Sequence, residues 1–132
     1  MQKHRMSNPQ VFQPPSPYSV GIRTTGGEKV LFLSGKVALD AKGQLVGKGD
    51  VEAQTRQVFS NLLSLLSSEG ASMKQVVKLT SFLTDASHLP TFTTVRKEFL
   101  KEEDVYPAST LVIVKGLAHP DWLVEVEATA VI

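Results

Sequence analysis

The chain has 132 residues, of which 42% are hydrophobic and 20% are charged. This size and composition are typical of one globular domain with one core, and they exclude disordered and fibrous classes. The 14 Lys and Arg residues nearly balance the 13 Asp and Glu residues, which gives a net charge of +1. A nucleic-acid partner is therefore not favoured, because phosphate binding normally depends on clustered Lys and Arg.

The absence of cysteine excludes a disulfide framework, a thiolate metal site and a cysteine nucleophile. No stretch approaches the roughly 20 apolar residues of a membrane span, and the first ten residues lack the apolar middle of a signal peptide. We therefore expect a cytoplasmic protein with no membrane partner. Met1 and Met6 are both compatible with a natural start.

Four prolines fall within residues 1–17, and we predict a flexible tail there, followed by a single domain over residues 18–132. Residues 19–25 and 26–39 have the composition of two strands. Gly26 and Gly27 between them favour a tight hairpin, because glycine readily adopts a positive φ. A turn is expected at residues 40–44, "DAKGQ".

Residues 51–68 show the clearest helical spacing, with apolar side chains on one face. Asp50 is a suitable N-cap and Gly70 a suitable terminator for this helix. A second helix is predicted over residues 90–101, because proline suits a first helical turn. Its core-facing residues are expected to be Phe92, Val95 and Phe99.

Three further strands are expected, at residues 74–85, 109–115 and 123–131. The element order strand, strand, helix, strand, helix, strand, strand predicts an α+β fold in which two helices back one sheet. Apolar residues occupy both alternating positions of several strands, and two helices cannot cover both faces of a sheet. The exposed face is therefore predicted to be buried in an obligate homo-oligomer.

Glu125 and Glu127 are two residues apart on a predicted strand, so both point to one face about 7 Å apart. This spacing resembles a carboxylate pair for acid/base chemistry, although a solvent-facing stripe has the same pattern. Ser34 marks a strand end before glycine and is either a turn residue or a site residue. No two of the three histidines share a metal-ligand spacing, and we expect neither a metal site nor a cofactor.

Five segments, taken in order and spacing, resemble the YjgF/RidA family, also known as L-PSP endoribonucleases. They are "PYS" at 17–19, "LFLSGK" at 31–36, residues 54–85, "YPAST" at 106–110 and "VEVEATAV" at 124–131. The resemblance implies a chorismate-mutase-like fold assembled as a homotrimer, with ligand clefts between subunits. It also implies hydrolysis of reactive imines and enamines, such as 2-aminoacrylate, to ketoacids and ammonia.

The family's cleft uses a tyrosine, a strand-end serine and a last-strand glutamate, which match Tyr18, Ser34 and Glu125. Its arginine does not match, because "PAST" places Ser109 at that position and Thr110 at the following serine. The arginine holds a substrate carboxylate through two charged hydrogen bonds, and losing both costs about 3 to 6 kcal/mol. We therefore expect no efficient 2-imino acid deamination, and Lys36 is the nearest candidate for a replacement cation.

Three interpretations follow from this resemblance. In the first, a divergent hydrolase uses Glu125 to activate water and Ser34 and Tyr18 to position the substrate, while a backbone N–H at Ser109 or Thr110 binds its oxygen. In the second, the trimer binds a small metabolite without chemistry. The third is an endoribonuclease, which the near-neutral charge and the lack of a histidine pair disfavour.

Overall fold

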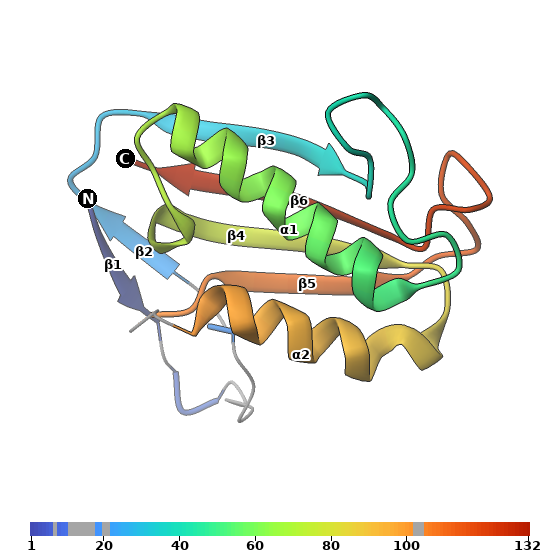
Figure 1. Ribbon diagram of the computed structural model, residues 1–132. Helices are drawn as coiled ribbons and strands as arrows, with labels where there is room; N and C mark the ends of the chain where they lie inside the picture. The colour runs from blue at the N-terminus through green and yellow to red at the C-terminus, as the bar shows by residue number, and fades with distance from the viewer. Residues whose placement is uncertain (7, 11–17, 20–21, 102–104) are drawn as a thin grey trace.

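The computed structural model describes residues 1–6, 8–10, 18–19, 22–101 and 105–132. Four strands form one sheet in the order β3-β6-β4-β5, and two helices pack on one face of it (Figure 1). The β3–β6 and β6–β4 pairs are antiparallel, whereas β4 and β5 are parallel. The predicted α+β architecture, a mixed sheet backed by two helices, is confirmed. The strands are β3 (Val30–Lys36), β4 (Val76–Leu83), β5 (Ala108–Ile113) and β6 (Val124–Val131).

Both helices lie where the sequence pattern predicts them. Helix α1 (Val51–Ser68) begins at Asp50, whose side chain accepts a hydrogen bond from the Ala53 N–H at 3.1 Å. Gly70 has a φ of 72° just beyond its end, which glycine adopts without strain. Helix α2 (Leu89–Leu100) starts one residue before the predicted Pro90. Two short 3-10 helices, Met73–Gln75 and Ala86–His88, precede β4 and α2.

The core lies between the two helices and the sheet. Phe59 of α1 packs against two rings of α2, with ring centroids 5.3 Å from Phe99 and 6.0 Å from Phe92. On the sheet side of the core, β6 contributes alternate buried residues: Val124, Val126, Ala128 and Ala130. Each large side chain buried in this way stabilises the fold by about 1.5 to 3 kcal/mol.

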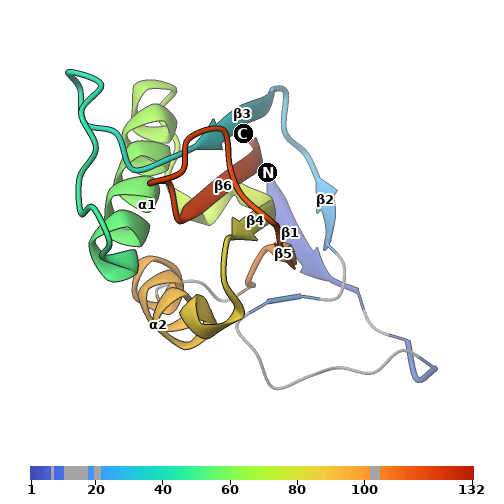
Figure 2. The same cartoon turned by 90° about the vertical axis from the view of Figure 1, so that its right-hand side faces the viewer.

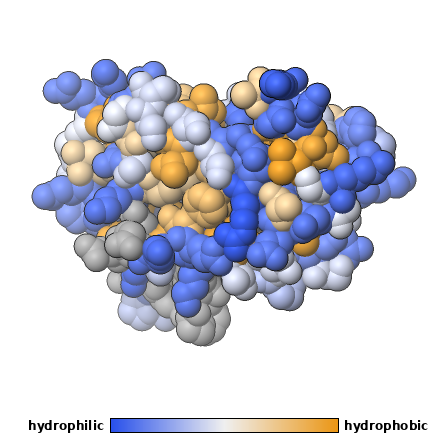
Figure 3. Space-filling model, viewed as in Figure 1, coloured by the Kyte–Doolittle hydropathy of each residue, from blue (hydrophilic) through white to orange (hydrophobic). Residues whose placement is uncertain are grey.

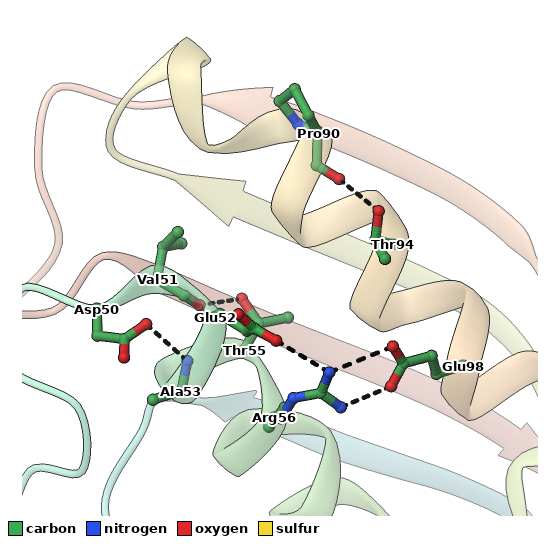
Figure 4. A network of polar contacts seen from close by, with 9 residues as sticks. All are labelled: Asp50, Val51, Glu52, Ala53, Thr55, Arg56, Pro90, Thr94 and Glu98. Carbon is green, nitrogen blue, oxygen red and sulfur yellow. Dashed lines mark hydrogen bonds and ion pairs between the residues drawn. The ribbon is translucent and has the colours of Figure 1, made fainter.

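An ion pair connects the exposed sides of the two helices (Figure 4). Arg56 of α1 donates to both carboxylate oxygens of Glu98 on α2, at 2.6 and 3.2 Å, and to Glu52 at 3.1 Å. The hydrogen bond from Arg56 lowers the pKa of Glu98 below its ordinary value. The charged pair therefore fixes α1 against α2 at the surface, as the aromatic cluster does below it.

The predicted hairpin at Gly26-Gly27 is wrong, although both glycines do have positive φ values of 66° and 99°. The strand before them, β2 (Ile22–Thr25), pairs with β1 (Gln2–Arg5) in a separate two-stranded sheet, and β3 pairs with β6 instead. The backbone N–H groups of Glu28 and Lys29 both donate to the carbonyl of Ile132. The chain that follows the turn is thus hydrogen-bonded to the residue after β6 and not to the preceding strand.

The predicted N-terminal tail is only partly described, and its first residues form strand β1. Lys3 of this strand donates to the Val76 carbonyl at 3.2 Å, which fastens the small sheet to the start of β4. Figure 2 shows β1 and β2 on the side of the main sheet away from the helices. The prolines that indicate a tail begin at Pro9, after this strand, and residues 11–17 lie outside the described part.

The sheet face opposite the helices is apolar at its edges and polar in its middle. Phe32 of β3 is 82% exposed, and Val30 and Val112 are also exposed. Between them stand Glu127 of β6 and the Lys78 and Thr110 side chains, which are joined by a 2.6 Å hydrogen bond. The expectation of apolar residues on both faces therefore holds at the two edges, and the homo-oligomer stays a prediction.

The helix-bearing face is coloured mostly as polar in Figure 3, with apolar patches between polar residues. Within the described residues, no helix combines the length and apolar character that crossing a membrane requires.

Candidate functional site

Tyr18 is held at the start of β5 by its neighbour Ser19. The Ser19 N–H donates to the Pro107 carbonyl at 3.0 Å, and its hydroxyl donates to the Tyr106 carbonyl at 2.5 Å. Ser19 also forms a parallel bridge with Ala108 and is 2% exposed. Ser19 and the "YPAST" segment, nearly ninety residues apart in the sequence, therefore form one local unit with Tyr18 half-buried beside it.

Ser109 lies on the helix-facing side of β5, opposite Leu79 of β4. Its hydroxyl accepts a 3.3 Å hydrogen bond from the Arg96 guanidinium, which comes from α2. Arg96 is only 6% exposed, and its Cζ lies 5.4 Å from the centre of the Phe92 ring. Burial lowers the pKa of Arg96, and the nearby Tyr18 phenol opposes this effect. Tyr18, Arg96 and Ser109 thus form one group, which we call the β5 group.

Thr110 does not belong to the β5 group. Because successive residues of a strand alternate between faces, its side chain lies on the opposite face from Ser109. There its hydroxyl accepts the hydrogen bond from Lys78. The Thr110 and Ser109 side chains therefore lie on opposite faces of β5, and the substrate-binding role of Thr110 stays a prediction.

Glu125 and Ser34 lie together at the other side of the sheet, between β6 and β3. An ideal Cβ at Gly35 would come within 2.7 Å of Glu125 Oε1, so the carboxylate rests directly against the Gly35 backbone. Glu125 is half-buried, whereas Glu127 on the same face is exposed and Ser34 is exposed on β3. We call Ser34, Gly35 and Glu125 the β3 group.

Lys36 follows an irregularity in the β3–β6 register between Leu33 and Lys36. It is half-buried and lines hollows between β3 and α1 together with Leu65. Since β3 and β5 are opposite edges of the sheet, Lys36 is far from Ser109 within one chain. Its role as a replacement cation stays a prediction, and the cation beside Ser109 in this structure is Arg96.

The two groups do not meet within one chain. The β5 group lies at one edge of the sheet on its helix side, and the β3 group lies at the opposite edge with Glu125 on the open face. A single chain therefore keeps the two groups apart. In the described part of the chain, no cluster of three His, Cys, Asp or Glu side chains is placed to hold a metal ion.

Two residues of the site were not identified from the sequence alone: Ser19 and Arg96. A signal for Arg96 was present, because Phe92, Val95, Arg96 and Phe99 follow the i, i+3, i+4, i+7 spacing of a core-facing stripe. A charged residue at such a position is unusual and indicates either a buried partner or a site. For Ser19 no local signal exists, because its partners are distant in sequence.

Comparison with known proteins places this arrangement in a family. The family model described as Endoribonuclease L-PSP matches residues 9–132. The 3-aminoacrylate deaminase RutC of Acinetobacter baylyi is 34% identical over 116 residues, which cover 88% of this chain and 90% of that protein. The 2-iminobutanoate/2-iminopropanoate deaminase of Dermatophagoides farinae is 28% identical over 130 residues, covering 98% and 97% of the two chains.

A solved structure agrees with these sequence matches. The Rid family protein YyfB of Yersinia pestis, described as of unknown function, superimposes with a TM-score of 0.89 at 31% identity, covering 100% of both chains. The fold, the position of the motifs and the sequence matches all lead to one assignment. The chain belongs to the Endoribonuclease L-PSP family, which is the YjgF/RidA family that its sequence motifs resemble.

Proposed function

We propose that this protein hydrolyses small imines or enamines in clefts formed between the subunits of a homotrimer. In each cleft the β3 group of one subunit faces the β5 group of the next. Two relatives of this chain support the reaction class, because their names identify them as 3-aminoacrylate and 2-iminobutanoate/2-iminopropanoate deaminases. The position of the two groups at opposite sheet edges supports an assembly in which neighbouring chains complete one another.

The reaction adds one water to a C=N bond and releases ammonia. An enamine first takes a proton on carbon and becomes an imine. Glu125 then accepts a proton from water as the oxygen attacks the imine carbon, and the same proton passes to the nitrogen. The carbinolamine hydroxyl then gives its proton to the nitrogen through Glu125, and the C–N bond breaks as the oxygen forms a carbonyl. One imine and one water thus give one carbonyl compound and one ammonia. Ser34 and Tyr18 position the substrate in this scheme.

The observation that carries the proposal is the position of Glu125. Its carboxylate packs against Gly35 and is half-buried, whereas Glu127, two residues along the same face, is exposed. A general base must be held within hydrogen-bond reach of the water that it activates, and contact with a rigid glycine backbone restricts the carboxylate in this way. Only Glu125 of the two glutamates has this restriction.

The test measures turnover of a defined imine. 2-Iminopropanoate is generated from alanine by an amino-acid oxidase, and pyruvate formation is followed against the uncatalysed rate. We expect the protein to accelerate pyruvate formation, though not efficiently, because Ser109 stands where the family has arginine. Glu125→Gln should lower kcat by about a hundredfold or more, as for loss of a general base. The matched control is Glu127→Gln, on the same strand face, which should retain turnover.

Ammonia release from 3-aminoacrylate provides a second substrate. Failure to accelerate hydrolysis of either compound would overturn the proposal and leave binding without chemistry as the function. Equal losses in the Glu125→Gln and Glu127→Gln variants would also contradict it, because the two residues differ only in their contact with Gly35 and in burial.

A further inference from the structure

Arg96 is buried without the partners that a guanidinium requires. It has five N–H donors, yet its hydrogen bond within the described residues is the long one, 3.3 Å, to the Ser109 hydroxyl. Its Nε is buried and has no hydrogen-bond partner in the described part of the chain. No described carboxylate forms an ion pair with it. A buried charge of this kind is costly unless something else compensates it.

Arg56, at the surface of the same two helices, provides a comparison with Arg96. It is partly exposed and is bonded to two carboxylates, Glu52 and Glu98. Arg96 lies on the buried side of α2 and has a hydroxyl and a phenyl ring instead. Arg56 thus has carboxylate partners for its guanidinium, whereas Arg96 keeps N–H donors that have no acceptor among the described residues.

The residues around Arg96 are those expected at a ligand site. Tyr18 lies close enough to interact electrostatically with the guanidinium, and Ser109 accepts its hydrogen bond. Both are half-buried, so they keep part of their surface accessible. The Phe92 ring lies 5.4 Å from Arg96 Cζ and stabilises the cation. The guanidinium is therefore held in place by the Phe92 ring and by Ser109.

We propose that Arg96 binds the carboxylate of the substrate, in place of an arginine at position 109. This inference rests on the proposed function and names the residue that recognises the charge of the substrate. A planar guanidinium with open donors matches the two oxygens of a carboxylate. A small carboxylate replaces the long contact to Ser109 with charged hydrogen bonds. The loss of affinity for a carboxylate that serine at position 109 predicts is thereby offset by Arg96 of helix α2.

The test measures binding of two reaction-product analogues that differ in charge, pyruvate and its neutral amide, pyruvamide. Wild-type protein is expected to bind pyruvate about tenfold to a hundredfold more tightly, as one additional charged hydrogen bond implies. Arg96→Gln should remove this preference and leave pyruvamide binding unchanged. Lys97→Gln is the matched control, because it removes one positive charge from the exposed side of the same helix.

Two further variants make the result decisive. Exchanging the two residues, Arg96→Ser with Ser109→Arg, returns a guanidinium to the same place and should restore the preference for pyruvate. Arg96→Lys keeps a charge but not the planar fork and should retain a weaker preference. The thermal midpoint of Arg96→Gln should not fall below that of wild type, because the variant removes an unpaired buried charge.

Equal affinity of the wild type for both ligands overturns the inference, as does an equal loss in Lys97→Gln. The outcome is separable from that of the proposed function. Arg96-dependent binding of pyruvate by wild-type protein that shows no turnover refutes the hydrolase alone. Glu125-dependent turnover that is indifferent to Arg96→Gln refutes only the carboxylate contact.

Discussion

The β3 group depends on a residue with no side chain. Gly35 has no positive φ, so its backbone conformation does not require glycine. What requires glycine is space, because the Glu125 carboxylate occupies the volume in which a Cβ would stand. Gly35 is in this sense a positioning residue for Glu125, and it acts through steric exclusion rather than through a bond.

Gly35→Ala therefore tests whether the position of Glu125 matters for activity. The added methyl would approach Glu125 Oε1 to 2.7 Å, and the end of a flexible side chain can move away at little cost in stability. We expect kcat to fall by about tenfold or more, because catalytic groups tolerate little misplacement. The thermal midpoint should change little. Gly116→Ala is the control, since a Cβ there meets no atom within 4 Å; unchanged kcat in Gly35→Ala would contradict the assignment.

The helices were predicted closely because their signals are local. The cap at Asp50, the apolar spacing over residues 51–68 and the terminator at Gly70 all lie within the element that they define. The prediction of a hairpin at Gly26-Gly27 was wrong. A glycine pair is a local signal, whereas the partner with which a strand pairs depends on residues far along the chain. Whether β3 pairs with β2 or with β6 depends on Ile132, more than a hundred residues away.

The contact between α1 and α2 should depend on pH through Glu98. The hydrogen bond from Arg56 lowers the pKa of Glu98 below its ordinary value of 4.5. The unfolded chain keeps the ordinary value, so the pair stabilises the fold above that pH and its contribution is lost as pH falls through the lowered pKa. In a double-mutant cycle of Arg56→Gln and Glu98→Gln, we expect a small favourable coupling energy at neutral pH that disappears in acid. A coupling energy independent of pH would refute this.

At the scale of the whole molecule, the sheet order β3-β6-β4-β5 separates the β3 group from the β5 group. The sequence motifs identified most members of both groups through family resemblance. They could not show that the two groups lie at opposite sides of the sheet, or that Arg96 of α2 lies beside Ser109. Those facts depend on strand order and helix packing, which no short motif contains.

Mixing two inactive variants tests whether neighbouring chains share each site. Glu125→Gln lacks the base of the β3 group, and Arg96→Gln lacks the cation of the β5 group. When the two are unfolded, mixed equally and refolded together, about one quarter of the clefts should combine intact groups from both chains. We therefore expect recovery of about that fraction of wild-type activity, measured as pyruvate formation. No recovery would mean that each site is built from one chain.

Strand β6 contains the last residues of the chain, yet it lies inside the sheet between β3 and β4. During synthesis, β3 has no pairing partner within the main sheet until residues 124–131 leave the ribosome. Strand β3, which includes Phe32, therefore stays unpaired while almost a hundred further residues are synthesised. Non-local pairing of this kind slows folding and leaves strand edges exposed to other chains. Termination before residue 124 would therefore yield a chain with both helices but with β3 separated from β4, and chaperones and proteases would readily bind such a chain.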